Sequence, residues 1–241
     1  MPEQQGGELK LLEYALSHDV EGSVRGIKSV AAILLDKHAA ALDGEAGELV
    51  QLLGAEAQRV SRLLDGLMGW LACAQQPLDF AWQDATKIAH EVFAKLSASG
   101  PERHIQFCVE PLPLLWSDSA ALQAIFRELL ANALKFTTGR STPVVTVSAR
   151  EAEGETVLAV QDNGVGFNAL HGEQLFKLFR RMHRKTEFEG EGAGLAIVRQ
   201  LMQRHGGRVW AEAQVNQGAT LHLAFPKPIS EEADTPAAVY S

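Results

Sequence analysis

The sequence is poor in cysteine, carries no long hydrophobic run and has no excess of basic residues. Its two cysteines, Cys73 and Cys108, indicate no disulfide framework and have no metal-ligand spacing around them, and a reducing compartment is the simplest interpretation. The net charge of −8 argues against nucleic acid as the main partner. Apolar runs such as residues 30–35 are too short to span a bilayer, and the first residues lack the features of a signal peptide. We therefore expect a cytoplasmic protein without membrane insertion.

Apolar residues recur at three- and four-residue steps before residue 77, a spacing that predicts two amphipathic helices. The first stripe, in a helix from about Glu8, comprises Leu12, Ala15, Val20, Val24, Ile27, Ala31 and Leu34, and the second comprises Leu49, Leu52, Leu53, Ala57, Val60, Leu63, Leu64, Leu67 and Leu71. Gly44 and Gly47 predict a turn between the two helices, within residues 41–47. Because a lone hairpin cannot cover both stripes, we expect a homodimer in which two copies form a four-helix bundle.

Short alternating stretches and further helices replace this pattern from residue 77 onward. Strands are expected over residues 78–82, 105–109, 144–149, 156–160, 208–213 and 220–225. Asp84, and Ser117 with Asp118, are expected to cap two helices. The acidic, small residues after Lys227 predict a disordered tail.

A glycine-containing turn, Asp162-Asn163-Gly164-Val165-Gly166-Phe167, follows the strand expected at 156–160. The two glycines permit positive φ and close approach to the main chain. The Asp162 carboxylate can accept a hydrogen bond from an exocyclic amine such as that of adenine. On its own, the segment is better explained as an ordinary surface turn.

Three further segments give this turn a context. They are Glu128 to Phe136 upstream, Gly190-Glu191-Gly192-Ala193-Gly194-Leu195 downstream, and Gly218-Ala219-Thr220 near the end. In this order and spacing, the four segments resemble the nucleotide-binding boxes of the ATPase domain shared by sensor histidine kinases, DNA gyrase B and Hsp90. The segment Gly206 to Trp210 narrows the resemblance to the histidine kinases, and the resemblance covers about residues 8–226.

The resemblance implies an α+β fold in which an N-terminal antiparallel helical hairpin precedes an α/β sandwich, a mixed sheet covered by helices on one face. The implied domains are a dimerisation and phospho-acceptor hairpin at 1–76, an ATP-binding catalytic domain at 77–228 and a disordered tail at 229–241.

The resemblance also implies ATP and Mg²⁺ as cofactors. Glu128 and Asn132 lie one helical turn apart and offer the hard oxygen ligands that Mg²⁺ prefers. The resemblance assigns Asn132 to the metal; Glu128, where close relatives commonly have Asn, could hold a metal-bound water or act as a base. Lys135 is a candidate phosphate contact, and the alternative is a solvated helix end. The implied nucleotide contacts are Asn132, Lys135, Asp162, Gly164, Gly166, Arg180, Arg181, Gly190, Gly192, Gly194, Leu195 and Thr220.

A basic cluster lies between the turn and the second glycine segment: Arg180, Arg181, His183, Arg184 and Lys185. It is either a solvated loop or a small lid whose charges face the triphosphate. The backbone N–H groups of the glycine segment, which opens a predicted helix, can bind phosphate oxygens.

His18, next to Asp19, resembles the phospho-acceptor of the family. A neutral imidazole nitrogen is a nucleophile toward a γ-phosphate, and an adjacent carboxylate can fix its tautomer and offset developing charge. The segment departs from the family at Ser23, which occupies a proline position, and at Gly22, where many relatives place the Thr or Asn that orients a water for dephosphorylation. A helix kink at Ser23 and a phosphatase activity are therefore both in question.

The resemblance implies a histidine kinase that autophosphorylates His18 from ATP and passes the phosphoryl group to an aspartate of a response regulator receiver domain. No sensor domain is evident, so input is expected from a longer chain or from a separate sensor chain. Two alternatives stay open: a kinase-inactive phosphotransfer or scaffold protein that binds ATP, and a protein-serine kinase of the superfamily that acts as an anti-sigma factor.

Overall fold

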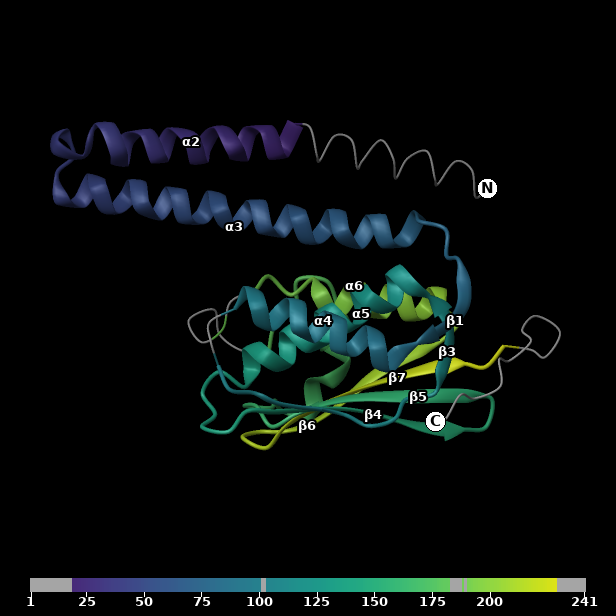
Figure 1. Ribbon diagram of the computed structural model, residues 1–241. Helices are drawn as coiled ribbons and strands as arrows, with labels where there is room; N and C mark the ends of the chain where they lie inside the picture. Colours follow the sequence, from purple (N-terminus) through teal and green to yellow (C-terminus); the bar gives the residue numbers. More distant parts are fainter. Residues whose placement is uncertain (1–18, 101–102, 183–187, 189, 229–241) are drawn as a thin grey trace.

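The computed structural model describes residues 19–100, 103–182, 188 and 190–228 of the chain. The elements are α2 (Glu21–Lys37), the 3₁₀ turn η2 (Ala39–Ala41), α3 (Gly44–Gln75), β1 (Phe80–Asp84), α4 (Ala85–Ser99), β2 (Gln106–Val109), β3 (Leu114–Asp118), α5 (Ser119–Phe136), β4 (Val144–Ala152), β5 (Glu155–Asp162), the 3₁₀ segment η3 (Ala169–Phe176), α6 (Gly194–Arg204), β6 (Arg208–Gln214) and β7 (Gly218–Pro226). Figure 1 shows three layers: the α2–α3 hairpin, the helices α4 to α6, and a sheet.

The hairpin turns earlier than its glycines predict. The Asp43 carboxylate accepts a hydrogen bond from the Ala46 backbone N–H at 2.7 Å and so caps α3. Gly44 and Gly47 therefore lie inside the first turns of α3, and the connection is made by residues 38–43. The prediction of a turn at these two glycines was wrong because a side-chain cap decides where a helix starts more strongly than nearby glycines do.

Part of the apolar surface of the hairpin stays exposed among the described residues. Val24, Ala57 and Leu64 form a small buried cluster between α2 and α3. The exposed large side chains include Ile27, Val30, Ile33, Leu49, Leu52, Leu53 and Val60. None of the described helices is long and apolar enough to cross a membrane.

The second half of the chain folds around a five-stranded sheet in the order β2-β4-β5-β7-β6. The β2–β4 pair is parallel and the other pairs are antiparallel, so the sheet is mixed. The helices α4, α5 and α6 cover one face of it (Figure 1). The core between the layers includes the fully buried residues Leu122, Ile125, Phe126, Leu129, Val145, Val147 and Leu223. The predicted fold class is confirmed.

Strand β3 was missed by the sequence analysis, which placed only a helix cap at its end. It pairs with β1 alone, as a separate two-stranded ribbon. The ribbon is held by an edge-to-face contact between Trp82 and Trp116, whose ring centroids are 5.5 Å apart. The caps at Asp84 and Asp118 are confirmed, since these residues accept hydrogen bonds from the backbone N–H groups of Lys87 and Ala121. Ser117 does not cap α5, because its hydroxyl bonds to His205 Nε2.

Two glycines let α3 pack closely on α6. A Cβ atom at Gly66 would lie 2.6 Å from Ala193 Cβ, and one at Gly69 would lie 3.4 Å from Ile197 Cδ1. At the same junction, the Arg204 guanidinium donates a hydrogen bond to the Cys73 carbonyl at 2.7 Å.

His205 joins the end of α6 to the start of α5. Its Nδ1 lies 2.7 Å from the Leu201 carbonyl, so this nitrogen carries the proton and donates. Its Nε2 therefore accepts, from the Ser117 hydroxyl at 3.0 Å and from the Asp118 backbone N–H at 3.3 Å. The network fits a neutral imidazole, and burial lowers the pKa of His205 below its ordinary value of 6.5.

Protonation of His205 should make the fold less stable in acid. The folded pKa is lower than the unfolded one, so the stabilisation is present above pH 6.5 and is lost as pH falls through the folded pKa. We expect urea unfolding to show a smaller loss of stability from pH 7.5 to pH 5.5 in His205→Gln than in the wild type. His104→Gln, at an exposed position, is the control and should behave as the wild type; an unchanged loss in His205→Gln would contradict the assignment.

Candidate functional site

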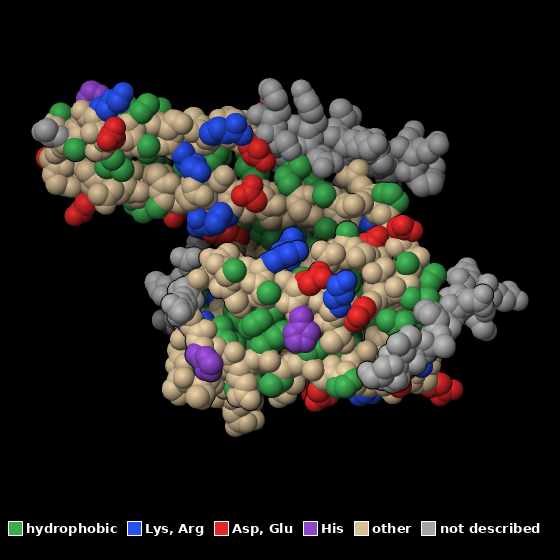
Figure 2. All heavy atoms as spheres, in the orientation of Figure 1, with side chains coloured by type: hydrophobic (Ala, Val, Ile, Leu, Met, Phe, Trp, Pro, Cys, Tyr) green, Lys and Arg blue, Asp and Glu red, His purple; other side chains and the backbone are tan. Residues whose placement is uncertain are grey.

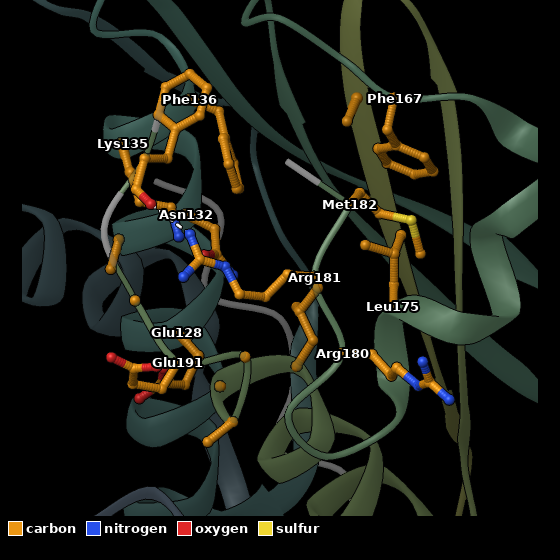
Figure 3. Close-up of a pocket in the computed structure, with 18 of the residues that line it drawn as sticks. Glu128, Asn132, Lys135, Phe136, Phe167, Leu175, Arg180, Arg181, Met182 and Glu191 are labelled. Atoms are coloured by element: carbon orange, nitrogen blue, oxygen red, sulfur yellow. Dashed lines mark hydrogen bonds between the residues drawn. The ribbon is translucent and has the colours of Figure 1, made fainter. Parts of the chain in front are cut away.

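A cavity of about 640 Å³ lies where α5, the segment after η3, the glycine segment before α6 and helix α3 meet. It is lined by Arg59, Arg62, Glu128, Ala131, Asn132, Lys135, Phe136, Asp162, Gly166, Phe167, Leu175, Arg180, Arg181, Met182, Phe188, Gly190, Glu191, Gly192, Ala193, Gly194, Leu195, Ala219 and Leu221. Figure 3 shows the charged side chains of α5 and of the glycine segment at some distance from an apolar group that includes Phe167, Leu175 and Met182.

Asp162 lies at the end of β5 and is 8% exposed. Its Oδ1 accepts the Gly164 backbone N–H at 2.7 Å, and the Ala219 backbone N–H also donates to the carboxylate. Burial raises the pKa of Asp162 to about 6, although both hydrogen bonds act in the opposite direction. A carboxylate held in this way is a fixed acceptor for an amine that enters the cavity.

The two glycines of the turn contact different parts of the molecule. Gly166 lines the cavity at φ +60°, and a Cβ there would lie 2.1 Å from the Gln214 carbonyl oxygen. Gly164 is not among the lining residues; a Cβ there would lie 2.6 Å from the Phe136 carbonyl oxygen. Gly164 therefore lets the turn pack against the end of α5, where the Val165 N–H donates to the Phe136 carbonyl.

Helix α5 presents Glu128, Asn132 and Lys135 to the cavity, three and four residues apart. The Lys135 ammonium lies 4.3 Å from the centroid of the Phe136 ring. Burial, followed by the positive charge of Arg181, lowers the pKa of Lys135. Figure 3 shows Arg181 extending toward Asn132, whereas Arg180 points away from α5. Cations partly removed from water in this way favour an anionic ligand.

The glycine segment forms the wall opposite the apolar group. Gly190 and Gly192 have φ of +117° and +78°, and the Gly192 carbonyl accepts the Phe179 N–H at 2.9 Å. A Cβ at Gly194 would lie 2.4 Å from Glu128 Oε2, so the start of α6 is pressed against α5. Free N–H groups at this helix start can bind phosphate oxygens.

The donor set around α5 fits a hard divalent ion only in part. Glu128 and Asn132 offer a carboxylate and an amide oxygen, the chemistry that Mg²⁺ prefers. Within the described part of the chain, no three His, Cys, Asp or Glu side chains come together as a metal site. A magnesium ion at these two residues would therefore draw its remaining ligands from water and phosphate.

The structure brings most of the predicted site residues together in one cavity: Glu128, Asn132, Lys135, Asp162, Gly166, Arg180, Arg181, Gly190, Gly192, Gly194 and Leu195. Thr220 is not among the lining residues. Its neighbours Ala219 and Leu221 line the cavity, so the alternation of the strand puts Thr220 on the other face of the sheet.

The predicted acceptor segment is described only from Asp19, which is exposed; His18 lies outside the described residues. The Ser23 hydroxyl donates a hydrogen bond to the Asp19 carbonyl at 2.8 Å. Gly22 is exposed, with open space where a side chain would be.

Three charged lining residues were not predicted as site residues by the sequence analysis. Arg59 and Arg62 come from α3, and Glu191 stands between the glycines of the second segment. The two arginines fall between the apolar positions of α3, where charged residues ordinarily face solvent, so no sequence pattern indicated them.

Comparison with known proteins places the ATPase part in a family. Residues 117–229 match the family of histidine kinase-, DNA gyrase B- and HSP90-like ATPases. Cyanobacterial phytochrome A from Nostoc sp. is 28% identical over 224 residues, which are 93% of this chain and 29% of that protein. The methanogenesis regulatory histidine kinase FilI from Methanothrix harundinacea is 28% identical over 228 residues, 94% of this chain and 25% of that protein. The chain thus spans less than a third of the length of these relatives.

Two solved structures share the fold. Full-length ShkA in complex with AMPPNP has a TM-score of 0.63 at 23% identity, covering 91% of this chain and 45% of that one. Histidine kinase ThkA in complex with the response regulator protein TrrA has a TM-score of 0.62 at 15% identity, covering 96% of this chain and 67% of that one.

Residues 117–229 therefore form an ATPase domain of the histidine kinase, DNA gyrase B and HSP90 type. The similarity to FilI, which is named a histidine kinase, extends over 94% of the chain and so includes the hairpin.

Proposed function

We propose that the chain is a two-component kinase that binds ATP, transfers its γ-phosphoryl group to His18 and passes that group to an aspartate of a response regulator. The observation that carries the proposal is the cavity itself, which combines a fixed acceptor at Asp162 with cations at Lys135 and Arg181. The names of the relatives and the AMPPNP bound to ShkA support ATP as the ligand.

In this proposal the residues of the cavity mainly bind and orient. Asp162 accepts the adenine amine, and the start of α6, Lys135 and Arg181 hold the phosphates. Glu128 and Asn132 would hold Mg²⁺, which offsets phosphate charge. An imidazole nitrogen of His18 then forms a bond to the γ-phosphorus while the bond from that phosphorus to the β–γ bridging oxygen breaks, and ADP leaves. Asp19 is proposed to orient the imidazole and offset its charge.

The exposed apolar face of the hairpin supports a homodimer, because a second hairpin would cover Leu49, Leu52 and Leu53. The partner regulator is supported by the ThkA–TrrA complex. We propose 1–76, 77–228 and 229–241 as the hairpin, the catalytic domain and the tail. A cytoplasmic location and input from a separate sensor chain belong to the same proposal.

Labelling with γ-³²P-ATP and Mg²⁺ tests the acceptor. The wild type should acquire phosphate that is lost in acid and stable in base, as expected of a phosphorylated imidazole. His18→Gln should lose this label while keeping ATP binding. Asn132→Ala should also lose the label, because the nucleotide site itself is changed. His38→Gln, on the same hairpin, is the control and should label normally. Label that survives His18→Gln would reject His18 as the acceptor.

The same experiment separates the alternatives. A kinase-inactive phosphotransfer or scaffold protein is favoured by the unusual Gly22 and Ser23, and it predicts ATP binding without label on the chain. An anti-sigma-type serine kinase predicts acid-stable phosphate on a partner protein.

A further inference from the structure

Helix α3 of the hairpin reaches the charged end of the cavity through two arginines. Both Nε and Nη2 of Arg62 lie 3.2 Å from Glu191 Oε1, and Arg59 Nε lies 3.7 Å from Glu191 Oε2. All three residues line the cavity. Figure 2 shows Lys, Arg, Asp and Glu side chains along the junction between the hairpin and the rest of the molecule.

The environment of Glu191 differs from that of an ordinary surface ion pair. Its side chain is 10% exposed, whereas those of Arg59 and Arg62 are 34% and 49% exposed. Arg59 Nε is buried and has no hydrogen-bond partner among the described residues, because the Glu191 carboxylate at 3.7 Å is too distant. A buried donor without an acceptor is costly, so this nitrogen is suited to a further anion.

The charge around this end of the cavity is unevenly balanced. Arg59, Arg62, Lys135 and Arg181 line the cavity together with the carboxylates of Glu128, Asp162 and Glu191, and the Asp162 carboxylate already accepts two backbone N–H groups. The Glu191 carboxylate thus pairs with the two arginines at the cavity wall, where an anionic ligand could take its place. A terminal phosphate offers more charge and more acceptor oxygens than one carboxylate, and guanidinium groups bind phosphate in bidentate fashion.

We propose that Arg59 and Arg62 bind the terminal phosphate of the nucleotide in exchange for Glu191, so that the hairpin completes the nucleotide site. The proposal rests on the proposed binding of ATP and adds positioning residues to it. It requires ATP and ADP to differ, because only ATP carries the γ-phosphate that the arginines meet. An ion pair that only holds the hairpin in place makes no such distinction.

Nucleotide affinity measured by calorimetry on the full chain tests this exchange. In Arg59→Ala/Arg62→Ala we expect AMPPNP affinity to fall about 10-fold or more, because charge-assisted hydrogen bonds are lost, and ADP affinity to change less than about threefold. In Glu191→Gln, the competitor carboxylate is gone, so AMPPNP affinity should be retained or increased. Arg25→Ala, an exposed arginine on α2, is the matched control and should leave both affinities unchanged.

Several outcomes would overturn the proposal. Equal losses for AMPPNP and ADP, or no loss for either, would leave the arginines as partners of acidic side chains only, Glu191 for both and Glu56 for Arg59. A loss of AMPPNP affinity in Glu191→Gln equal to that of the arginine variant would also contradict the exchange. Circular dichroism checks folding, and Arg59→Gln/Arg62→Gln repeats the test with longer side chains. If the wild type bound no AMPPNP, the proposed function itself would fail, which is a distinguishable result.

Discussion

Replacing Asp162 by asparagine is expected to lower ATP affinity by about 10- to 100-fold. The carboxylate accepts backbone N–H groups from Gly164 and Ala219, and an asparagine amide cannot accept on its nitrogen side. The variant therefore disturbs the turn and also weakens the acceptor proposed for the adenine amine. Loss of the charge-assisted hydrogen bond to the amine, about 1.5–3 kcal/mol, corresponds to a loss of affinity of about 10- to 100-fold. Calorimetry with AMPPNP measures it, and Asp36→Asn, at an exposed position of α2, is the control. An affinity within a few-fold of the wild type would contradict the assigned role.

The same variant should change how stability depends on pH. The folded pKa of Asp162, about 6, is above its ordinary value of 3.8. The folded state therefore binds this proton more tightly, and the associated stability is present below pH 3.8 and lost as pH rises through about 6. The full cost at neutral pH is about 3 kcal/mol. Denaturant unfolding without nucleotide should show this decline in the wild type and not in Asp162→Asn. His205 contributes the opposite slope to both proteins, so their difference isolates Asp162; equal slopes would contradict the prediction.

Replacing Gly166 by alanine is expected to destabilise the fold by about 3 kcal/mol and to abolish nucleotide binding. The residue has φ +60°, and its new Cβ would lie 2.1 Å from the Gln214 carbonyl oxygen and 2.8 Å from that of Gly218. Both atoms belong to the backbone of the β6–β7 turn, which is tied to the Asp162 turn by the hydrogen bond from Asn216 N–H to the Val165 carbonyl at 2.7 Å. Neither atom can move away without breaking that contact.

Gly154→Ala is a matched control for this prediction. Gly154 also has positive φ, +73°, but a Cβ there would meet no atom within 4 Å. It should therefore cost only about 1 kcal/mol, from backbone strain. Thermal unfolding and AMPPNP binding distinguish the two variants. Equal destabilisation would show that strain at φ, and not the contact with the β6–β7 turn, makes Gly166 necessary.

The features that the sequence predicted well are those that depend on neighbours in the chain. Asp84 and Asp118 cap helices through N–H groups three residues away, so spacing alone was sufficient. The cavity residues of α5 share a face because of helical periodicity. Their grouping with Asp162 and the glycine segment rested on the resemblance to a family of known fold.

The features that the sequence did not predict depend on distant partners. Arg62 and Glu191 are separated by 129 residues and meet only because α3 packs on α6. The face of β7 on which Thr220 lies depends on the register with β5 and β6, which a short alternating stretch does not specify. Strand β3 forms by pairing with β1, from which α4 and β2 separate it in the sequence. The pattern of its five residues alone was therefore too short to predict a strand.

The glycines at 66 and 69 have a mechanical consequence. They leave one narrow side of α3 without side chains, and that is the side on which Ala193 and Ile197 rest. Successive residues of an α-helix are rotated by about 100° about its axis, so the neighbours of Gly66 and Gly69 in the chain point to other sides of α3. A larger side chain at position 66 or 69 would therefore push α3 away from the start of α6, which also lines the cavity.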